Sequence, residues 1–135
     1  MGIGRIAHPV DIAVSGLRAQ SARMSVIAGN IANSSTAKAE NGEPYRRREV
    51  VLSTSSDGLG LVDVDGIETD TTRDFQRVYR PGSPGADKDG YMKMPNVQLP
   101  VEMMEMTMAS RAYQASAASL KRYQEMMDVT MELLQ

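Results

Sequence analysis

The chain has 135 residues, enough for one small domain, and its apolar residues include 11 Met but only one Phe and no Trp. Aromatic side chains usually supply much of the area buried in a core, so we expect part of the apolar surface to be buried against other chains. A net charge of −2 and a pI near 5.4 argue against nucleic acid as a partner, and the absence of Cys excludes disulfides and thiolate metal sites.

The first ten residues lack the apolar run and the small-residue cleavage site of a Sec-type signal peptide. The sequence therefore predicts no cleaved signal. Apolar runs elsewhere in the chain are much shorter than the ~20 residues that a membrane-spanning helix requires. We accordingly expect no direct membrane insertion.

The first periodic segment, Val10 to Ile31, predicts an amphipathic helix. Apolar residues that recur every seven positions form one seam along a helix. This seam and its neighbours on the same face are Val10, Ala13, Leu17, Met24, Ile27 and Ile31. Pro9 suits the first turn, because its missing N–H would lack a helical partner there. The hydroxyl residues after Asn33 are expected to end the helix, because their side chains compete for backbone hydrogen bonds.

Residues 34–99 contain most of the Gly and Pro and predict a small, irregular β insert. Four short runs have the composition of strands: Tyr45–Leu52, Leu61–Val64, Gln76–Tyr79 and Tyr91–Met94. Three Asp-Gly pairs predict turns between strands: Asp57-Gly58, Asp65-Gly66 and Asp89-Gly90.

The second periodic segment, from about Val101 to Leu134, predicts a longer helix with a second seam. A strict seven-residue repeat is typical of helices that supercoil around a partner. The repeat is Met106, Tyr113, Leu120, Met127 and Leu134, with Met103, Ala117 and Met131 at the companion position. Pro100 is expected in the first turn. Met104 and Met108 lie off the seam, which favours a second contact face.

Together these segments predict a mainly α chain with a small β insert. We expect an N-terminal helical segment at 1–33, the insert at 34–99, and at 100–135 a C-terminal helix that pairs with the N-terminal one. The apolar residues of the C-terminal helix can pack against the chain's own N-terminal helix or against other chains, and the pattern does not choose between them.

Catalytic and metal-binding patterns are missing from the sequence. The single His, His8, lies near the N-terminus without a nucleophile beside it in the sequence. Glu102 and Glu105 are interpreted as acids that compensate the helix dipole on a solvated face. The acids between Asp63 and Asp70 lack the spacing of a calcium loop. We predict no enzyme, no cofactor and no metal.

Three short motifs carry a family resemblance. Ser15-Gly16-Leu17-Arg18-Ala19-Gln20 and Gly29-Asn30-Ile31-Ala32-Asn33 resemble the N-terminal signature of the bacterial flagellar rod and hook axial proteins, and Arg111-Ala112-Tyr113-Gln114-Ala115 resembles their C-terminal motif. Segments 42–47 and 90–97 extend the resemblance over nearly the whole chain. Two positions depart from the family pattern, Gly29 and Ser116.

The resemblance implies a structural subunit of the proximal rod of the flagellar basal body, which crosses the periplasm and transmits torque. It implies that the terminal helices pair as an antiparallel coiled coil on assembly, with the two seams as the assembly surface. The implied partners are copies of the chain and other rod proteins. The flagellar type III export apparatus would export the chain unfolded, without a cleaved signal.

Three alternatives remain at this stage. The first is another exported filament or tail-tube subunit with helical ends. The second is a small enzyme or metal-binding module built on the β insert. The third is an amphipathic membrane-surface protein, which the charge pattern disfavours, because residues 101–134 contain five acids and three bases.

Overall fold

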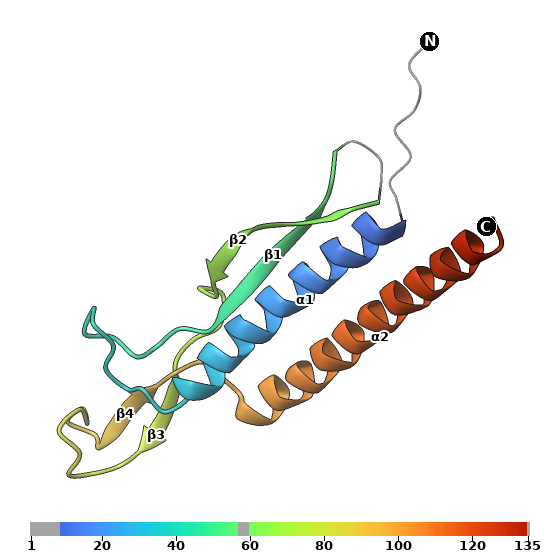
Figure 1. Ribbon diagram of the computed structural model, residues 1–135. Coiled ribbons are helices and arrows are strands. Elements are labelled where there is room, and N and C mark those ends of the chain that lie inside the picture. The colour runs from blue at the N-terminus through green and yellow to red at the C-terminus, as the bar shows by residue number, and fades with distance from the viewer. Residues whose placement is uncertain (1–8, 57–59, 135) are drawn as a thin grey trace. The chain divides into compact units, whose positions relative to one another are not determined.

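A computed structural model describes residues 9–56 and 60–134 of the chain. Its elements follow in the order α1 (Pro9–Ala32), β1 (Arg48–Thr54), β2 (Val62–Thr69), β3 (Gln76–Tyr79), β4 (Tyr91–Met94) and α2 (Leu99–Glu132), as Figure 1 shows. The strands form two two-stranded sheets, β1 with β2 and β3 with β4. These elements confirm the prediction of a mainly α chain with a β insert.

Both helices begin and end close to the predicted residues. α1 starts with Pro9, and beyond its last residue the Ser34 hydroxyl donates a 2.8 Å hydrogen bond to the carbonyl of Ile31. This is the competition that the sequence predicted. α2 has Pro100 as its second residue, and the N–H of Glu102 donates to the Gln98 carbonyl at 3.1 Å. Within the described residues, neither helix has the length and hydropathy needed to cross a bilayer.

The strands agree with the sequence in part. β3 and β4 have the predicted bounds, while β1 begins three residues late and β2 continues to Thr69. The predicted turn at Asp65-Gly66 is wrong, because both residues lie inside β2. Gly66 has no positive φ, which the second central residue of an Asp-Gly turn requires. The predicted Asp57-Gly58 turn lies outside the described residues, as does His8.

The β3–β4 hairpin pairs its strands antiparallel. Arg77 lies opposite Lys93, and Tyr79 lies opposite Tyr91. The turn predicted at Asp89-Gly90 is confirmed, since Gly90 has a φ of 82° and leads directly into β4. A side chain at Gly90 would be strained by this φ.

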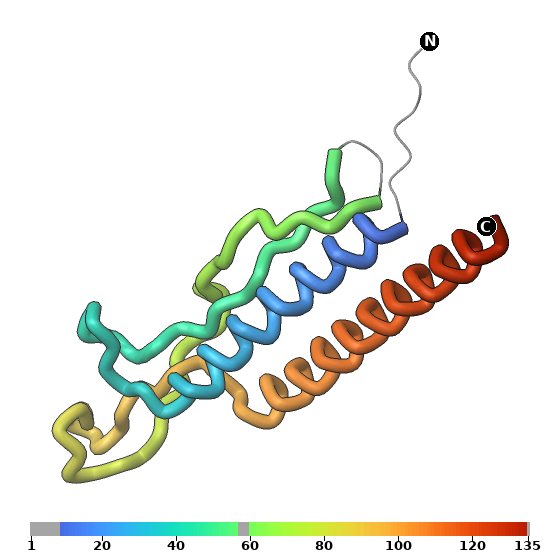
Figure 2. The backbone as a smooth tube through the Cα atoms, viewed as in Figure 1, coloured from blue at the N-terminus to red at the C-terminus, as the bar shows by residue number. Residues whose placement is uncertain are grey.

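The chain forms two compact units, each built from separate stretches of sequence. The first unit comprises the described residues of 1–24, 50–66 and 107–135. Within it, the segments of α1 and α2 lie side by side with opposite chain directions (Figures 1 and 2). A Cβ added to Gly16 would lie 3.4 Å from the Ser116 hydroxyl oxygen, and Ala19 and Ala109 are buried. Small residues at these positions allow close packing.

The second unit comprises residues 25–49 and 67–106. Its buried apolar residues include Ile27 and Val97. Polar side chains are buried beside them, and these are Asn30, Arg47, Asn96 and Glu102. The unit is therefore held by polar contacts as well as by apolar packing.

Candidate functional site

An ion-pair network lies at the centre of the second unit. Arg47 is 3% exposed and Glu102 is 1% exposed, and the Nε of Arg47 donates a hydrogen bond to Glu102 Oε1. The Nη2 of Arg47 donates to Glu105 Oε2 at 3.1 Å, and its Nη1 forms an ion pair with Glu49. The prediction that Glu102 lies on a solvated face is wrong, because Arg47 covers it.

Asn30 joins this network from α1. It is 0% exposed, and its Nδ2 donates to Glu102 Oε2 at 3.0 Å and to the Arg48 carbonyl at 2.9 Å. Its Oδ1 accepts from the Arg48 N–H at 2.9 Å and from the Tyr45 hydroxyl at 3.0 Å. Burial raises the pKa of Tyr45 above its usual value, which keeps this donor protonated. One amide thus connects α1, α2 and the start of β1.

Asn96 extends the network toward the loop after β2. Its Oδ1 accepts from the Arg47 N–H at 2.7 Å, and its Nδ2 donates to the carbonyls of Asp70 and Arg73, both at 3.2 Å. The Asp70 carboxylate accepts from the hydroxyl of Thr72, which is the main cause of its lowered pKa. The loop is therefore ordered around an ionised carboxylate.

The network determines which residues of the second unit meet. A buried ion pair adds little net stability, but removing one partner leaves an uncompensated buried charge and is costly. Every buried oxygen of Glu102 has a donor, and Asn30 uses both of its polar atoms. A shift of either helix by one residue would break several of these contacts.

The N-terminal seam residues are all at least partly covered. Ile27 is buried, and the other four are half-buried: Val10, Leu17, Met24 and Ile31. In α2 only part of the predicted seam is covered. Met106 and Leu120 are half-buried, whereas Tyr113, Met127 and Leu134 are exposed.

The most covered stripe of α2 is one that the sequence prediction missed. Glu102 and Ala109 are buried, and Ser116 and Tyr123 are half-buried at the same seven-residue spacing. Two of these residues are small and one is charged, so a search for apolar repeats does not detect them. The seven-residue spacing of these four positions is the feature of the sequence that could have indicated the stripe.

The family-motif residues have different environments. The Ser15 hydroxyl donates to the Ile12 carbonyl at 2.8 Å and accepts from the Val62 N–H at 3.2 Å. The Asn33 Nδ2 donates to the Gly29 carbonyl at 2.9 Å. Gly16, Gln20 and Ala112 are half-buried, and Ala32, Arg111 and Gln114 are exposed.

Much of the apolar surface of α2 and of the residues after it is exposed. At the C-terminal end, Leu133 is 82% exposed and Leu134 is 78% exposed. Other large exposed residues from α2 are Leu99, Met103, Met104, Met108, Met126, Met127, Val129 and Met131. Large exposed apolar surfaces mark sites of interaction with other proteins or with membranes.

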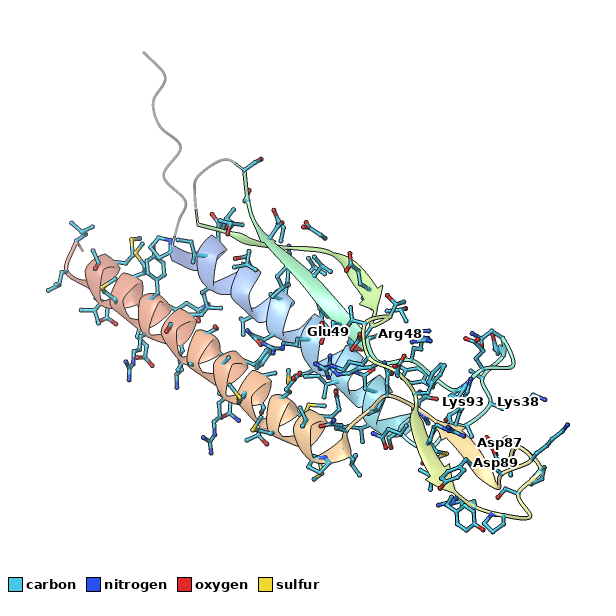
Figure 3. All side chains as sticks on the ribbon, turned by 180° about the vertical axis from the view of Figure 1, so that it is seen from behind. Lys38, Arg48, Glu49, Asp87, Asp89 and Lys93 are labelled. Carbon is cyan, nitrogen blue, oxygen red and sulfur yellow. The ribbon has the colours of Figure 1, made fainter. Side chains whose placement is uncertain are left out.

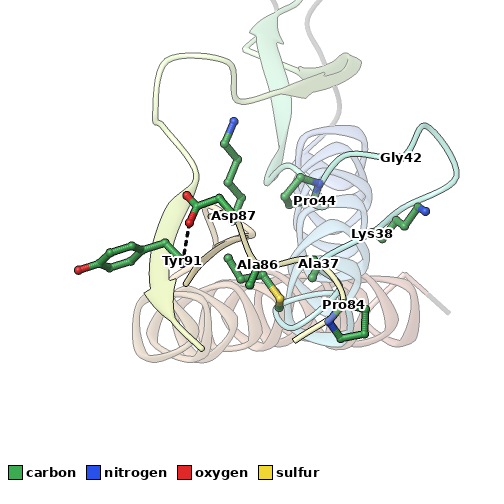
Figure 4. A pocket seen from close by; sticks show the side chains of 11 residues that line it. Ala37, Lys38, Gly42, Pro44, Pro84, Ala86, Asp87 and Tyr91 are labelled. Atoms are coloured by element: carbon green, nitrogen blue, oxygen red, sulfur yellow. Dashed lines mark hydrogen bonds between the residues drawn. The ribbon is translucent and has the colours of Figure 1, made fainter. Parts of the chain in front are cut away.

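Candidate metal ligands do not cluster in the part of the chain that the structure describes. No group of three or more His, Cys, Asp or Glu residues there is placed to hold a metal ion. The second unit has a hollow of about 580 Å³ between the loops that contain Ala37 and Ala86 (Figure 4). Its lining is mostly apolar, and Lys38 and Lys93 are its cations.

Comparisons with known proteins agree with the motifs. Residues 11–39 match the family described as flagella basal body rod protein, and residues 88–133 match the flagellar basal body rod FlgEFG protein C-terminal family. The chain is 40% identical to the flagellar basal-body rod protein FlgC of Salmonella typhimurium, over 91% of this chain and 93% of that protein. It is 31% identical to FlgC of Bacillus subtilis, over 93% of this chain and 96% of that protein.

Proposed function

The chain belongs to the family of flagellar basal-body rod proteins of the FlgC type, and on that premise we propose how it builds the rod. It is a structural subunit of the flagellar basal-body rod. Its relatives are structural proteins and not enzymes, and the family assembles with other rod components. We propose which surfaces of the subunit contact other rod subunits and where in the rod the subunit lies.

Segments 1–33 and 100–135 are the assembly segments, and residues 34–99 are a spacer. The two helices pair as an antiparallel coiled coil within the assembled rod, where their outer faces pack against copies of the chain and other rod proteins. Repeated contacts of this kind, related by a rotation that does not close, generate a helical tube. Such a tube is the proximal rod, and it transmits torque across the periplasm.

The exposed apolar surface of α2 is the observation that carries the proposal. A surface helix of a monomer normally exposes polar residues on its outer face. Here Met103, Met104 and Met108 are exposed on α2. Flexible Met side chains adapt to irregular neighbours, which suits a subunit that meets several partners.

Delivery through the flagellar type III export apparatus fits the same chain. Passage through such an apparatus requires an unfolded chain. The sequence has no Cys, so no disulfide opposes unfolding. The contacts that hold the second unit, both polar and apolar, are noncovalent, so they can reform after passage.

Asp substitutions on the seams test this proposal. Leu17→Asp, Leu120→Asp and Met127→Asp are each expected to abolish incorporation into purified basal bodies, because a charge on a buried helix interface is costly. Ser21→Asp and Ser119→Asp are matched controls, since both serines are exposed. Met127 is exposed in the free chain, so its variant separates lost assembly from lost folding. Normal rods with all three seam variants would contradict the seam proposal.

A further inference from the structure

The outer surface of the β3–β4 hairpin carries four ordered side chains. Alternate residues of a strand point to the same face, and the register pairs Arg77 with Lys93 and Tyr79 with Tyr91. We call this set of four residues the hairpin face. Tyr79 is 62% exposed and Tyr91 is 40% exposed, and both cations are also exposed.

Contacts within the hairpin hold this face in one arrangement. The rings of Tyr79 and Tyr91 meet edge to face with centroids 5.3 Å apart, and the Arg77 guanidinium lies 4.9 Å from the Tyr91 ring centroid. Arg77 also donates to Asp87 Oδ2 at 2.9 Å. The other oxygen of Asp87 accepts from the N–H groups of Tyr91 at 2.8 Å and Asp89 at 3.0 Å. Side chains ordered before binding lose little entropy on binding.

The hairpin places its aromatic residues outward. The opposite face carries Val78, Met92 and Met94, which are half-buried. Tyr91 lies at the edge of the hollow, and in Figure 4 its ring extends away from Ala37, Ala86 and Pro84. Tyr and Arg are enriched among the residues that contribute most to binding at protein interfaces. The hairpin face therefore has the composition of an interface.

A surface of opposite charge lies elsewhere in the same unit. A depression of about 240 Å³ is lined by Glu49, Glu68, Asp70 and Arg73, together with three Thr residues. Its volume is below the roughly 300–1,000 Å³ of small-molecule pockets and suits a side chain. Figure 3 shows Glu49 well separated from Lys93 and Asp87 within the unit. Among the described residues, neither Lys93 nor Glu68 has an ion-pair partner.

We propose that the hairpin face of one subunit docks on the Glu49 and Glu68 surface of a second copy of this chain. Lys93 and Arg77 then face the two carboxylates, and the Tyr79 and Tyr91 rings cover the neighbouring Thr residues. The inference rests on the proposed rod function, which requires repeated contacts between subunits.

A second copy is the occupant because both complementary surfaces belong to one chain at different places. Contact between two different surfaces of the same protein is heterologous, and it continues from subunit to subunit. Opposite charges across such a contact also set its register and exclude wrong pairings.

Cysteine cross-linking in purified basal bodies tests the contact, because the chain has no Cys of its own. Arg80→Cys lies beside the hairpin face and Thr71→Cys lines the acidic depression. Cells that express both variants should yield a disulfide-linked dimer of the two, and neither variant alone should yield one. Basal bodies that contain both variants without the mixed dimer would overturn the proposal, and so would equal dimer yields from each variant alone.

Charge reversal sharpens the test. Lys93→Glu in the Arg80→Cys chain should lower the dimer yield by about tenfold through like-charge repulsion, and Glu68→Lys in the Thr71→Cys chain should restore it. Lys38→Glu makes the same change in net charge at an exposed position of the 34–99 insert and should leave the yield unchanged. An unchanged yield with Lys93→Glu, in basal bodies that contain the subunit, would refute this contact and leave the rod function intact. Loss of the Leu17→Asp, Leu120→Asp or Met127→Asp subunit from purified basal bodies tests the proposed rod function. It does not test the contact of the hairpin face.

Discussion

The two units of the chain are stabilised by different means. The first unit packs helical segments through small residues, among them Gly16, Ala19 and Ala109. The second unit buries Asn30, Arg47 and Glu102 in a connected polar network. Polar contacts have strict geometry, so the network selects one arrangement of its partners. Small residues allow the helical segments to pack closely, while larger apolar side chains of the first unit, such as Met108 and Met126, are exposed.

We therefore distinguish residues whose contacts stabilise the fold from exposed residues that are available for assembly. In the second unit, the buried side chains of Asn30, Asn96 and Glu102 have hydrogen-bond partners within the chain. The residues after 124 in α2 are all exposed, and under the proposed function their apolar side chains become buried against a partner. We expect substitutions in the second unit to affect folding first, and substitutions on the outer face of α2 to affect assembly first.

The largest expected effect is that of Glu102→Ala. It leaves the buried Arg47 guanidinium without its covered partner and removes the acceptor of the Asn30 amide, at a cost of about 3–5 kcal/mol in the free energy of unfolding. Denaturant unfolding measures the loss, and hydrogen exchange at the amides of Arg47 and Arg48 locates it. Glu105→Ala is the matched control, because the Glu105 side chain is 25% exposed and its loss should cost less.

A paired substitution sharpens this expectation. Arg47→Met together with Glu102→Met should destabilise the chain less than Glu102→Met alone, because no buried charge is left unpaired. If the double variant lost as much free energy of unfolding as the two single variants together, the ion pair itself would be the source of the stability.

Overpacking of the first unit should have an intermediate effect. Ala109→Leu adds volume at a position that is 1% exposed and should cost about 1–3 kcal/mol, measured by thermal unfolding. Gly16→Ala is the control, because its new methyl would lie at an ordinary contact distance from Ser116. That change should be neutral or stabilising by up to ~1 kcal/mol, through the better helix propensity of Ala. Equal losses for both variants would contradict close packing at Ala109.

Met127→Asp should change the stability of the free chain by less than ~0.5 kcal/mol, since exposed positions tolerate substitution and Met127 is exposed. Denaturant unfolding of the purified subunit is the measurement. A loss comparable with that of Glu102→Ala would show that Met127 is buried in the free chain. That result would contradict the assignment of Met127 to an assembly surface that does not contribute to folding.

The smallest effect concerns pH. The hydrogen bond from the Tyr91 N–H is the main cause that lowers the pKa of Asp87. A carboxyl whose folded pKa is lowered stabilises the fold above its unfolded pKa of about 3.9, and this contribution is lost as the pH falls through the folded value. The Tyr91 amide chemical shift should follow this titration below pH 4. In Asp87→Asn the titration should disappear, and its persistence would exclude Asp87 as the titrating group.

The helices and the β3–β4 hairpin were predictable from local sequence. Pro9, Pro100 and the seven-residue repeats locate α1 and α2, because helix periodicity and first-turn preferences depend on residues close in sequence. The Asp89-Gly90 turn was found for the same reason. Asp65-Gly66 has the same composition but lies in β2, because pairing with β1 overrides the local preference of the dipeptide.

The candidate site was predictable only in part. Asn30 stands in a recognisable motif, yet nothing around it in the sequence indicates that it binds Glu102 and Arg48. Arg47 has Arg46 and Arg48 beside it, and only Arg47 is buried. The partners of Asn30 and Arg47 are 72 and 55 residues away in the chain, a separation at which periodicity carries no information.

Local sequence was thus enough to predict the two terminal helices, the β insert between them and the family to which the motifs belong, because each depends on spacing and composition over a few turns of chain. Tertiary structure alone decided that Glu102 is buried rather than solvated, and that Tyr79 and Tyr91 face outward beside two cations. Burial of a polar residue depends on which distant donor reaches it, and a fold provides that donor only when both segments are in place.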